Sequence, residues 1–390
     1  MAGVAMVKQG LREVYNNVVD IDDAMVELKK VTTESTEAYS QFSDRAAKTS
    51  RDLGASISDY VSATADWARL GYGLPDAEEL ARVSTLFANV GDGIENIADA
   101  SSYMISILKG FDLAADDAQK VADLINEVAN NEPASASDIS EILTRSGAAL
   151  HEAGNDLSQA ISLGVAMNSV TQNAQSTGQT LKTVSMYLRA AKTDLENMGE
   201  SSDGCANSVS ELRSELKQLT GVDIMKDAAG TQFKSTYDIL KEISEVWGSL
   251  SDVTRANVTE MLGGKRNANA VAAVLSQFEI AEKSMKDAAN SAGSAAKENE
   301  VYLSSITGKL AQLDSAFQQL SQDLLDSSLI KFFVDFATAS VDIADGAVKA
   351  AGALPTLTAA ISGVLSLLQM SGKLKNGAGK VNMPSYICCV

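Results

Sequence analysis

Residues 76–91 read DAEELARVSTLFANVG, a segment that opens on an acidic residue and closes on a glycine. Asp76 is predicted to start a helix, because a carboxylate accepts hydrogen bonds from the free amides of a first turn. Gly91 is predicted to end it, since glycine adopts the left-handed backbone of a helix C-terminus without strain. This one segment therefore has the start, length and stop of a single helix.

The same design recurs from Ser56 to Ala191. The preceding segment, ISDYVSATADWARLG at residues 57–71, has Ser58 as a predicted N-cap and Gly71 as a predicted stop. Short helices joined by short turns pack as antiparallel pairs, so the region is predicted to be an array of helical hairpins. Five more helices are expected, at residues 94–110, 114–131, 138–154, 158–170 and 178–191.

No stretch of the chain alternates polar and apolar residues for long enough to predict a strand. Hydrophobic residues make up 45% of the sequence, with only 5% aromatic residues and 4 prolines, so aliphatic residues and alanine must form the core. These residues favour helices. We predict an all-α fold, with the hairpin array between long amphipathic or coiled-coil helices at both ends.

The predicted N-terminal helix has apolar or small residues at alternating spacings of four and three, which is a heptad pattern. Its middle is polar, so it is expected either to form a modest coiled coil or to lie across another helix of the same chain. The positions are Val14, Val18, Ile21, Met25, Leu28, Thr32, Ser35, Tyr39, Phe42 and Ala46.

A second heptad pattern, near residue 310, has no polar interruption. It predicts either a self-association seam or one core-facing helix of a larger bundle. The seam residues are Leu303, Ile306, Leu310, Leu313, Phe317, Leu320 and Leu324.

These patterns divide the chain into five predicted segments. A polar run, ENMGESSDGCANSV at residues 196–209, marks the boundary after the hairpin core. The segments are a long amphipathic helix at 1–55, the hairpin core at 56–200, a second helical segment at 201–300, a coiled-coil-like helix at 301–345, and an apolar helix and tail at 346–390.

Residues 350–372 contain no charged side chain and are flanked by Lys349 and Lys373. Pro355 interrupts the stretch, and the part after it is shorter than the roughly 20 residues that a membrane span needs. Two interpretations remain open: membrane contact, or a buried or oligomer-facing helix. The residues available for membrane contact are Leu354, Leu357, Ile361, Val364, Leu365 and Leu368.

The charge of the chain argues against nucleic-acid binding. There are 51 acidic and 32 basic residues, giving a formal charge of −19, which repels phosphate backbones. The three cysteines are Cys205, Cys388 and Cys389, too few and too badly spaced for a disulfide framework or a zinc site. A reducing compartment such as a cytoplasm is expected.

The sequence has no recognisable catalytic, cofactor or metal motif, so no enzyme activity, cofactor or metal is predicted. The single histidine, His151, lies near a predicted helix end and is interpreted as a capping residue. Cys205 has no histidine near it in the sequence. LGGKRNANA, residues 262–270, lacks the spacing of a phosphate-binding loop, so Gly263 and Gly264 are interpreted as a helix end.

The succession of these pieces resembles the core region of phage tail tape-measure proteins. The resemblance covers roughly residues 20 to 370 and depends on the order of the pieces, because no single piece is diagnostic. The pieces are WARLGYGLPDAEELARVSTLFANVGDG and its continuation to residue 131, SASDISEILTRSGAALHEAG and its continuation to residue 192, residues 237–275 and residues 309–339.

The resemblance implies a scaffold around which the tail tube polymerises, whose length sets tail length and which leaves the tube during DNA ejection. It implies other copies of the chain, the tail tube protein, tail assembly chaperones and tail tip proteins as partners, in the tail lumen of the virion after assembly in the host cytoplasm. Because the chain is short for a ruler and has no hydrolase-like segment, we expect a fragment or truncated form.

Two alternatives come from other classes of protein. A membrane-active helical protein would use residues 350–372 to help the genome across a host membrane. A secreted helical-hairpin effector is suggested only by helicity, length and the pair Trp247 and Gly248.

Overall fold

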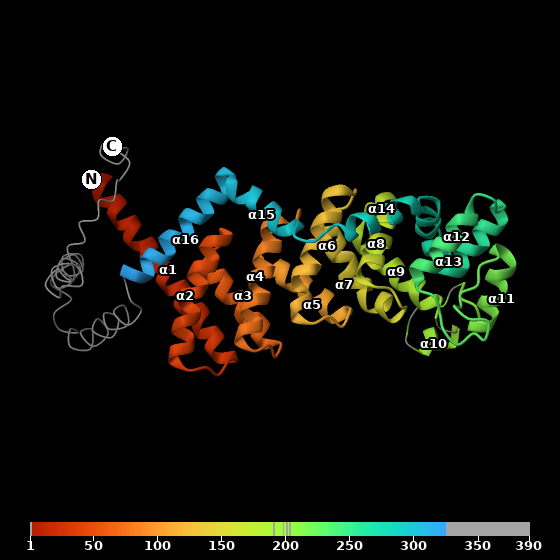
Figure 1. Cartoon of the computed structure of the whole chain (residues 1–390), viewed down its shortest axis with the longest axis horizontal. Coiled ribbons are helices and arrows are strands. Elements are labelled where there is room, and N and C mark those ends of the chain that lie inside the picture. Colours follow the sequence, from red (N-terminus) through yellow and green to blue (C-terminus); the bar gives the residue numbers. More distant parts are fainter. Residues whose placement is uncertain (1, 190–191, 198, 200–201, 203, 325–390) are drawn as a thin grey trace, which may run out of the picture. The chain divides into compact units, whose positions relative to one another are not determined.

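The computed structural model describes residues 2–189, 192–197, 199, 202 and 204–324. The described helices all belong to one compact unit, which ends at residue 324 (Figure 1). The hairpin region contains α1 (Ala2–Val31), α2 (Thr36–Leu53), α3 (Ile57–Arg69), α4 (Leu74–Val90), α5 (Ile97–Gly110), a 3-10 turn η1 (Ala115–Asp117), α6 (Ala118–Asn131), α7 (Ala136–Glu152), α8 (Leu157–Thr171) and α9 (Ala174–Tyr187).

In the part of the chain that the structure describes, seven helices come after α9: α10 (Lys192–Asn197), α11 (Val209–Thr220), α12 (Thr236–Trp247), α13 (Asp252–Ser276), α14 (Phe278–Ala289), α15 (Ser294–Ser304) and α16 (Ile306–Leu324). The β-type pairing within the described ranges is one antiparallel bridge between Met225 and Phe233, in the loop before α12. The prediction of an all-α fold is confirmed.

Local capping chemistry explains where the helices begin. The predicted N-cap Ser58 is wrong by two residues: Ser56 caps α3, its Oγ accepting a hydrogen bond from the Asp59 amide. Ser58 lies inside the first turn, with its Oγ 2.8 Å from Ser56 Oγ. Helix α4 starts two residues before Asp76, because Pro75 fits the first turn, where no N–H donor is needed.

The predicted stops agree with the structure. Gly91 is the C-cap of α4, but the predicted left-handed backbone is wrong, because its φ of −81° and ψ of 108° are extended. Glycine fits there because a Cβ atom would lie 2.8 Å from the Phe87 carbonyl oxygen. Helix α3 ends at Arg69, and Gly71 follows with a φ of 93°.

The helix predicted over residues 1–55 is instead two helices. They are separated at residues 32–35, because Ser35 caps α2 by accepting from the Ala38 amide. Along the part of α1 whose side chains are described, Val18, Ile21, Met25 and Leu28 are buried. The heptad pattern was expected either to form a coiled coil or to lie across another helix of the same chain. The structure shows the second, because α1 packs against α3.

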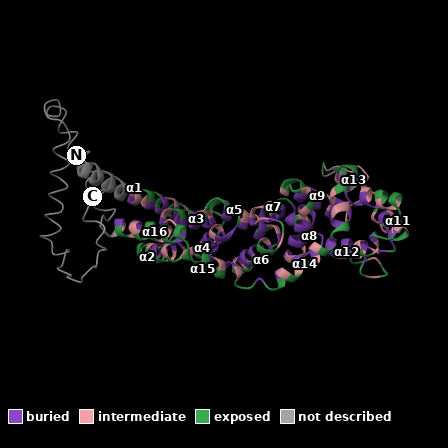
Figure 2. Cartoon of the chain, turned by 90° about the horizontal axis from the view of Figure 1, so that it is seen from above, coloured by how far each residue is buried: buried purple, intermediate pink, exposed green. Residues whose placement is uncertain are grey.

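One hydrophobic core runs from Ile21 on α1 to Ala295 on α15 (Figure 2). Trp67 and Tyr60 on α3 are among its largest fully buried side chains. Helix α7 packs against α5, α8 and α9, and α13 packs against α8 and α9. The hairpin core predicted to end near residue 200 therefore shares its interior with the segment that follows it.

The last three helices retrace the hairpin array in reverse order. Helix α14 packs on α8 and α6, α15 on α6 and α4, and α16 on α2 and α1. We call α14, α15 and α16, residues 278–324, the return leg. It brings residues near 320 beside residues near 55, as the blue and red helices of Figure 1 show.

Candidate functional site

The predicted seam forms an exposed apolar face on α16. Ile306 is 80% exposed, Leu310 61%, Leu313 65% and Leu320 49%. Phe317 is half-buried, and Leu324 is the last residue of the helix. Among the described residues, more exposed large apolar side chains lie on α16 than on any other helix. We call Ile306, Leu310, Leu313, Phe317, Leu320 and Leu324 the α16 seam.

Leu303, the first residue of the predicted seam, lies apart from the others. It belongs to α15, and the helix breaks at Ser305, whose Oγ accepts the Gly308 amide at 3.0 Å and caps α16. Leu303 is half-buried next to Gly54 at the end of α2. The continuous heptad pattern therefore begins at Ile306.

The opposite face of α16 is polar and buried. Ser315 donates to the Ala55 carbonyl, and Gln318 Oε1 accepts the Ile57 amide at 2.8 Å. Arg51 Nη1 donates to Gln319 Oε1 at 3.0 Å. The bonds from Ser315 and Gln318 satisfy backbone groups left free between α2 and α3. Helix α16 thus attaches to the array through its polar side and leaves its apolar side uncovered by the described chain.

Sequence reasoning missed Ser315 and Gln318. The signal available was weak: Gly308, Ala311, Ser315 and Gln318 form a strip of small and amide residues opposite the seam. From the sequence, such a strip fits a solvent-facing side as well as a buried one. Its hydrogen-bond partners are not among the residues nearby in the sequence.

Helix α15 is also held by polar contacts. The buried carboxylate of Asp123 on α6 accepts hydrogen bonds from the Gly293 amide at 3.0 Å and the Ala295 amide at 3.1 Å. Asn126, on the same helix, donates to Glu298 Oε2 at 3.0 Å. The free amides at the start of α15 thus receive their acceptor from a neighbouring helix.

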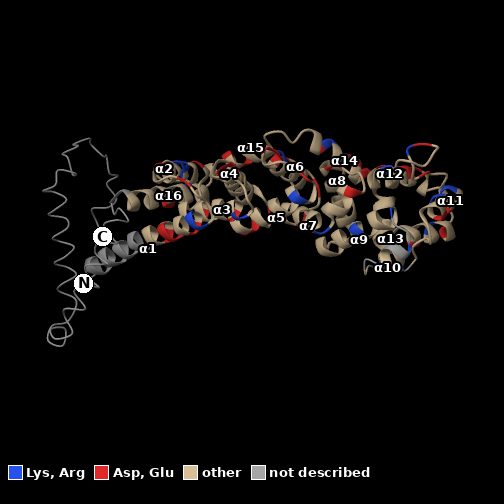
Figure 3. Ribbon diagram, turned by 90° about the horizontal axis from the view of Figure 1, so that it is seen from below, with Lys and Arg blue, Asp and Glu red and all other residues tan. Residues whose placement is uncertain are grey.

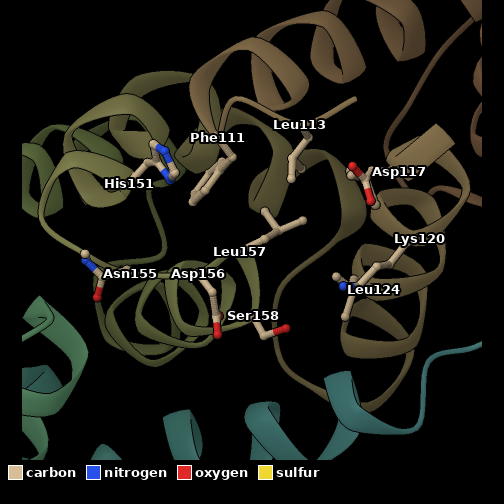
Figure 4. A pocket seen from close by; sticks show the side chains of 12 residues that line it. Phe111, Leu113, Asp117, Lys120, Leu124, His151, Asn155, Asp156, Leu157 and Ser158 are labelled. Atoms are coloured by element: carbon tan, nitrogen blue, oxygen red, sulfur yellow. The ribbon is translucent and has the colours of Figure 1, made fainter. Parts of the chain in front are cut away.

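A surface cavity of about 460 Å³ lies where the segment after α5, α6, the end of α7 and the start of α8 meet (Figure 4). Three of its polar side chains already have structural roles. Asp117 accepts the Ala114 amide, Asp156 caps α8, and Asn155 Oδ1 accepts the Tyr237 amide at 2.8 Å. The cavity lies where helices meet, and these three polar side chains stabilise the fold.

His151 lies in the last turn of α7, as predicted, and its ring packs edge-on against Phe111 at a centroid distance of 5.8 Å (Figure 4). Its observed ring contact is thus aromatic packing. Burial raises the pKa of the Cys205 thiol, which disfavours the nucleophilic thiolate. Within the described residues, no group of three histidine, cysteine or acidic side chains could hold a metal ion.

The region LGGKRNANA is a kink inside α13. Gly264 has φ 71° and ψ 170°, and Asn267 Nδ2 donates to the Gly263 carbonyl at 2.8 Å across the break. The helix end predicted at Gly263 and Gly264 is confirmed, with the second half of α13 following directly.

Basic and acidic residues are interspersed along the described helices, and no single basic surface stands out in the view of Figure 3. No helix in the described part of the chain is long and apolar enough to cross a membrane. The apolar stretch 350–372, with the six residues predicted for membrane contact from Leu354 to Leu368, lies outside the described residues.

An exposed heptad face on an all-α array is the kind of surface by which helices associate with one another. A sequence profile of the phage-related minor tail protein family matches residues 43–264, more than half of the chain, and the chain belongs to that family.

The chain is also 23% identical over 393 aligned residues to the probable tape measure protein of Halomonas phage phiHAP-1. The alignment covers 93% of this chain and 43% of that relative, so the chain spans less than half of the relative's length. The resemblance to tape-measure proteins is confirmed, whereas no solved structure matches.

Proposed function

We propose that this chain acts as a tape-measure scaffold of a phage tail, around which the tail tube assembles, which sets tail length and which is released during DNA ejection. The observation that carries the proposal is the similarity to a probable tape measure protein along 93% of the chain.

The proposed partners are further copies of the chain, the tail tube protein, tail assembly chaperones and tail tip proteins. We place the protein in the tail lumen after assembly in the host cytoplasm. The proposal includes no catalytic role and no cofactor, in keeping with membership in a tail protein family. It includes no direct nucleic-acid contact, since the chain carries a formal charge of −19.

The test is tail length in virions made from an altered phage gene. A cassette of four ideal heptads, inserted in frame after residue 324, adds about 42 Å if the inserted helix lies along the tube axis. We expect tails longer by about that amount in electron micrographs. A synonymous recoding of the same position is the matched control and should leave tail length unchanged. Infectious particles with the insertion and tails of normal length would refute the ruler function.

A further inference from the structure

The α16 seam is an apolar face that the rest of the described chain does not cover. Four of its side chains are about half exposed or more, while the opposite side of the helix is already bonded to α2 and α3. Exposed contiguous apolar surface of this kind marks an interaction site. A partner that binds the seam needs apolar side chains at the same alternating spacing of three and four residues. Another helix with the same heptad pattern has this spacing.

The charges beside the seam indicate which helix fits. With Leu310 and Phe317 at a positions and Ile306, Leu313 and Leu320 at d positions, Lys309 occupies a g position and Asp314 an e position. In a parallel, in-register pair, a g residue lies beside the e residue five positions later on the other helix. Lys309 therefore meets Asp314 of a second copy, and this opposite-charge contact forms twice in each pair.

Antiparallel pairing is less favourable. When the apolar layers are matched with Leu310 opposite Leu320, e positions lie beside e positions. Asp314 then faces Asp314 of the second copy, and like charges at such positions destabilise a helix pair. The g positions of this arrangement place Lys309 beside Asp323, so it has two opposite-charge contacts and one like-charge contact. The parallel pair has two opposite-charge contacts and no like-charge contact. The side chains of Lys309 and Asp314 are both exposed in the described unit. One carboxylate oxygen of Asp314, Oδ2, accepts a hydrogen bond from Gln318 Nε2 at 3.0 Å, and Oδ1 is left for Lys309 of the second copy.

We propose that the α16 seam binds the same seam of a second copy of this chain, parallel and in register, with Lys309 paired to Asp314 across the contact. The inference rests on the proposed scaffold function, in which copies of the chain lie side by side. The contact needs no rearrangement of the fold, because the face that binds is the one already turned away from α2 and α3.

Charge reversal tests the pairing, using the purified full chain and sedimentation equilibrium. Lys309→Glu and Asp314→Lys should each weaken association about tenfold, and the double variant should restore it. Lys297→Glu, at an exposed lysine on α15 outside the seam, is the control and should not change association. A chain that stays monomeric at about 100 μM, or a double variant no better than the single ones, overturns the proposal.

A second variant separates binding from folding. Leu310→Ser should abolish association while leaving the helical circular dichroism and the thermal midpoint unchanged, since Leu310 is 61% exposed. Loss of association together with loss of helical signal would show that Leu310 supports the fold and would contradict the docking role.

Cysteine cross-linking tests the orientation, in a background with Cys205, Cys388 and Cys389 changed to serine. In a parallel, in-register contact, Leu310→Cys and Leu320→Cys each form a disulfide with their own kind. In an antiparallel contact, disulfides form efficiently only when the two variants are mixed. Cross-links confined to the mixture overturn the proposed orientation.

The two proposals fail differently. Seam-dependent association with tail length unaffected by the heptad insertion removes the ruler function and keeps the contact. A monomeric chain whose insertion still lengthens tails removes the contact and keeps the ruler function.

Discussion

At the scale of the residue, Gly264 shows how one backbone position shapes an element. Its φ of 71° and ψ of 170° lie in a region that is essentially restricted to glycine. The residue is buried, and Gly204 packs so close that a Cβ atom there would lie 3.3 Å from Gly264 Cα. The paired glycines let the loop after α10 pass directly over the kink in α13.

Gly264→Ala should therefore lower the free energy of unfolding by about 1–3 kcal/mol, because alanine is strained in this conformation. The matched control is Gly248→Ala, where the backbone is helical and no atom lies within 4 Å of a built Cβ. That control is expected to change stability by about 0.5 kcal/mol or less, in either direction. Urea denaturation measures both. If Gly264→Ala and Gly248→Ala changed the free energy of unfolding equally, the kink would not be the reason for glycine at position 264.

Asp223 carries an ion pair whose stabilisation depends on pH. Hydrogen bonds from Arg213, at 2.7 and 2.8 Å, together with the Met225 amide and Lys217, hold the pKa of its carboxyl far below the usual range. A carboxyl whose pKa is lowered by folding stabilises the protein above its unfolded pKa, about 3.9. That stability is lost as the pH falls below this value toward the folded pKa.

Asp223→Asn should cost about 1–2 kcal/mol of unfolding free energy at pH 7, and the difference from the parent should shrink steadily below about pH 4. Chemical denaturation at several pH values measures this. Asp252→Asn, at a fully exposed carboxylate, is the control. A deficit in Asp223→Asn that is as large at pH 2 as at pH 7 would mean that the ion pair is not its source.

At the scale of the element, polar groups attach α15 and α16, the last two helices of the return leg. Asp123 accepts two amides at the start of α15, and Ser315 and Gln318 bond the backbone between α2 and α3. A buried amide that loses its acceptor costs about 1–3 kcal/mol, so such contacts hold an element in one place more strictly than apolar packing does. Helices α15 and α16 are therefore specific in position, whereas α14 also packs Phe278, Ala281 and Ala288 into the core.

Asp123→Ala should release the start of α15 and lower the free energy of unfolding by about 2 kcal/mol. Hydrogen exchange is the direct measurement: amides of residues 293–304 should exchange faster, while those of α7 should keep the parent rate. Asp116→Ala, at an exposed carboxylate of the nearby turn η1, is the control. Unchanged exchange in α15 would contradict the role of Asp123 as a cap supplied by another helix.

At the scale of the whole unit, the core is continuous between residues 21 and 295. The two tryptophans report on distant parts of it. Trp67 on α3 is fully buried and donates to Ser84 Oγ, and Trp247 on α12 donates to Ser276 Oγ at 3.0 Å. A continuous core predicts that both parts lose their structure together.

Urea unfolding followed by tryptophan fluorescence measures this. Trp67→Phe leaves Trp247 as the reporter, and Trp247→Phe leaves Trp67, since the chain has only two tryptophans. Each variant is also followed by far-UV circular dichroism, which reports all helices. In both variants the fluorescence and circular dichroism midpoints should coincide. A clear separation in either variant would show that the unit unfolds in parts.

Much of the fold could be predicted from local sequence. The stops at Gly71, Gly91 and Gly264 were predictable, because a glycine end depends on residues within one or two turns. The start of α3 was placed two residues late, at Ser58 instead of Ser56, because two serines compete for one cap position. The heptad pattern of the α16 seam was predicted from the sequence. The polar side of α16, which attaches the helix to the array, was not.

The sequence by itself determined the all-α fold, the hairpin order and the family resemblance, because helix periodicity and capping act over a few residues. Only the tertiary structure decided which side of α16 faces inward. A heptad pattern defines an apolar face without saying what covers it. The choice depends on Gln318 reaching the Ile57 amide, a bond between residues 261 positions apart in the chain. Contacts at that separation have no local pattern, so the outward direction of the seam appears only once the return leg is in place.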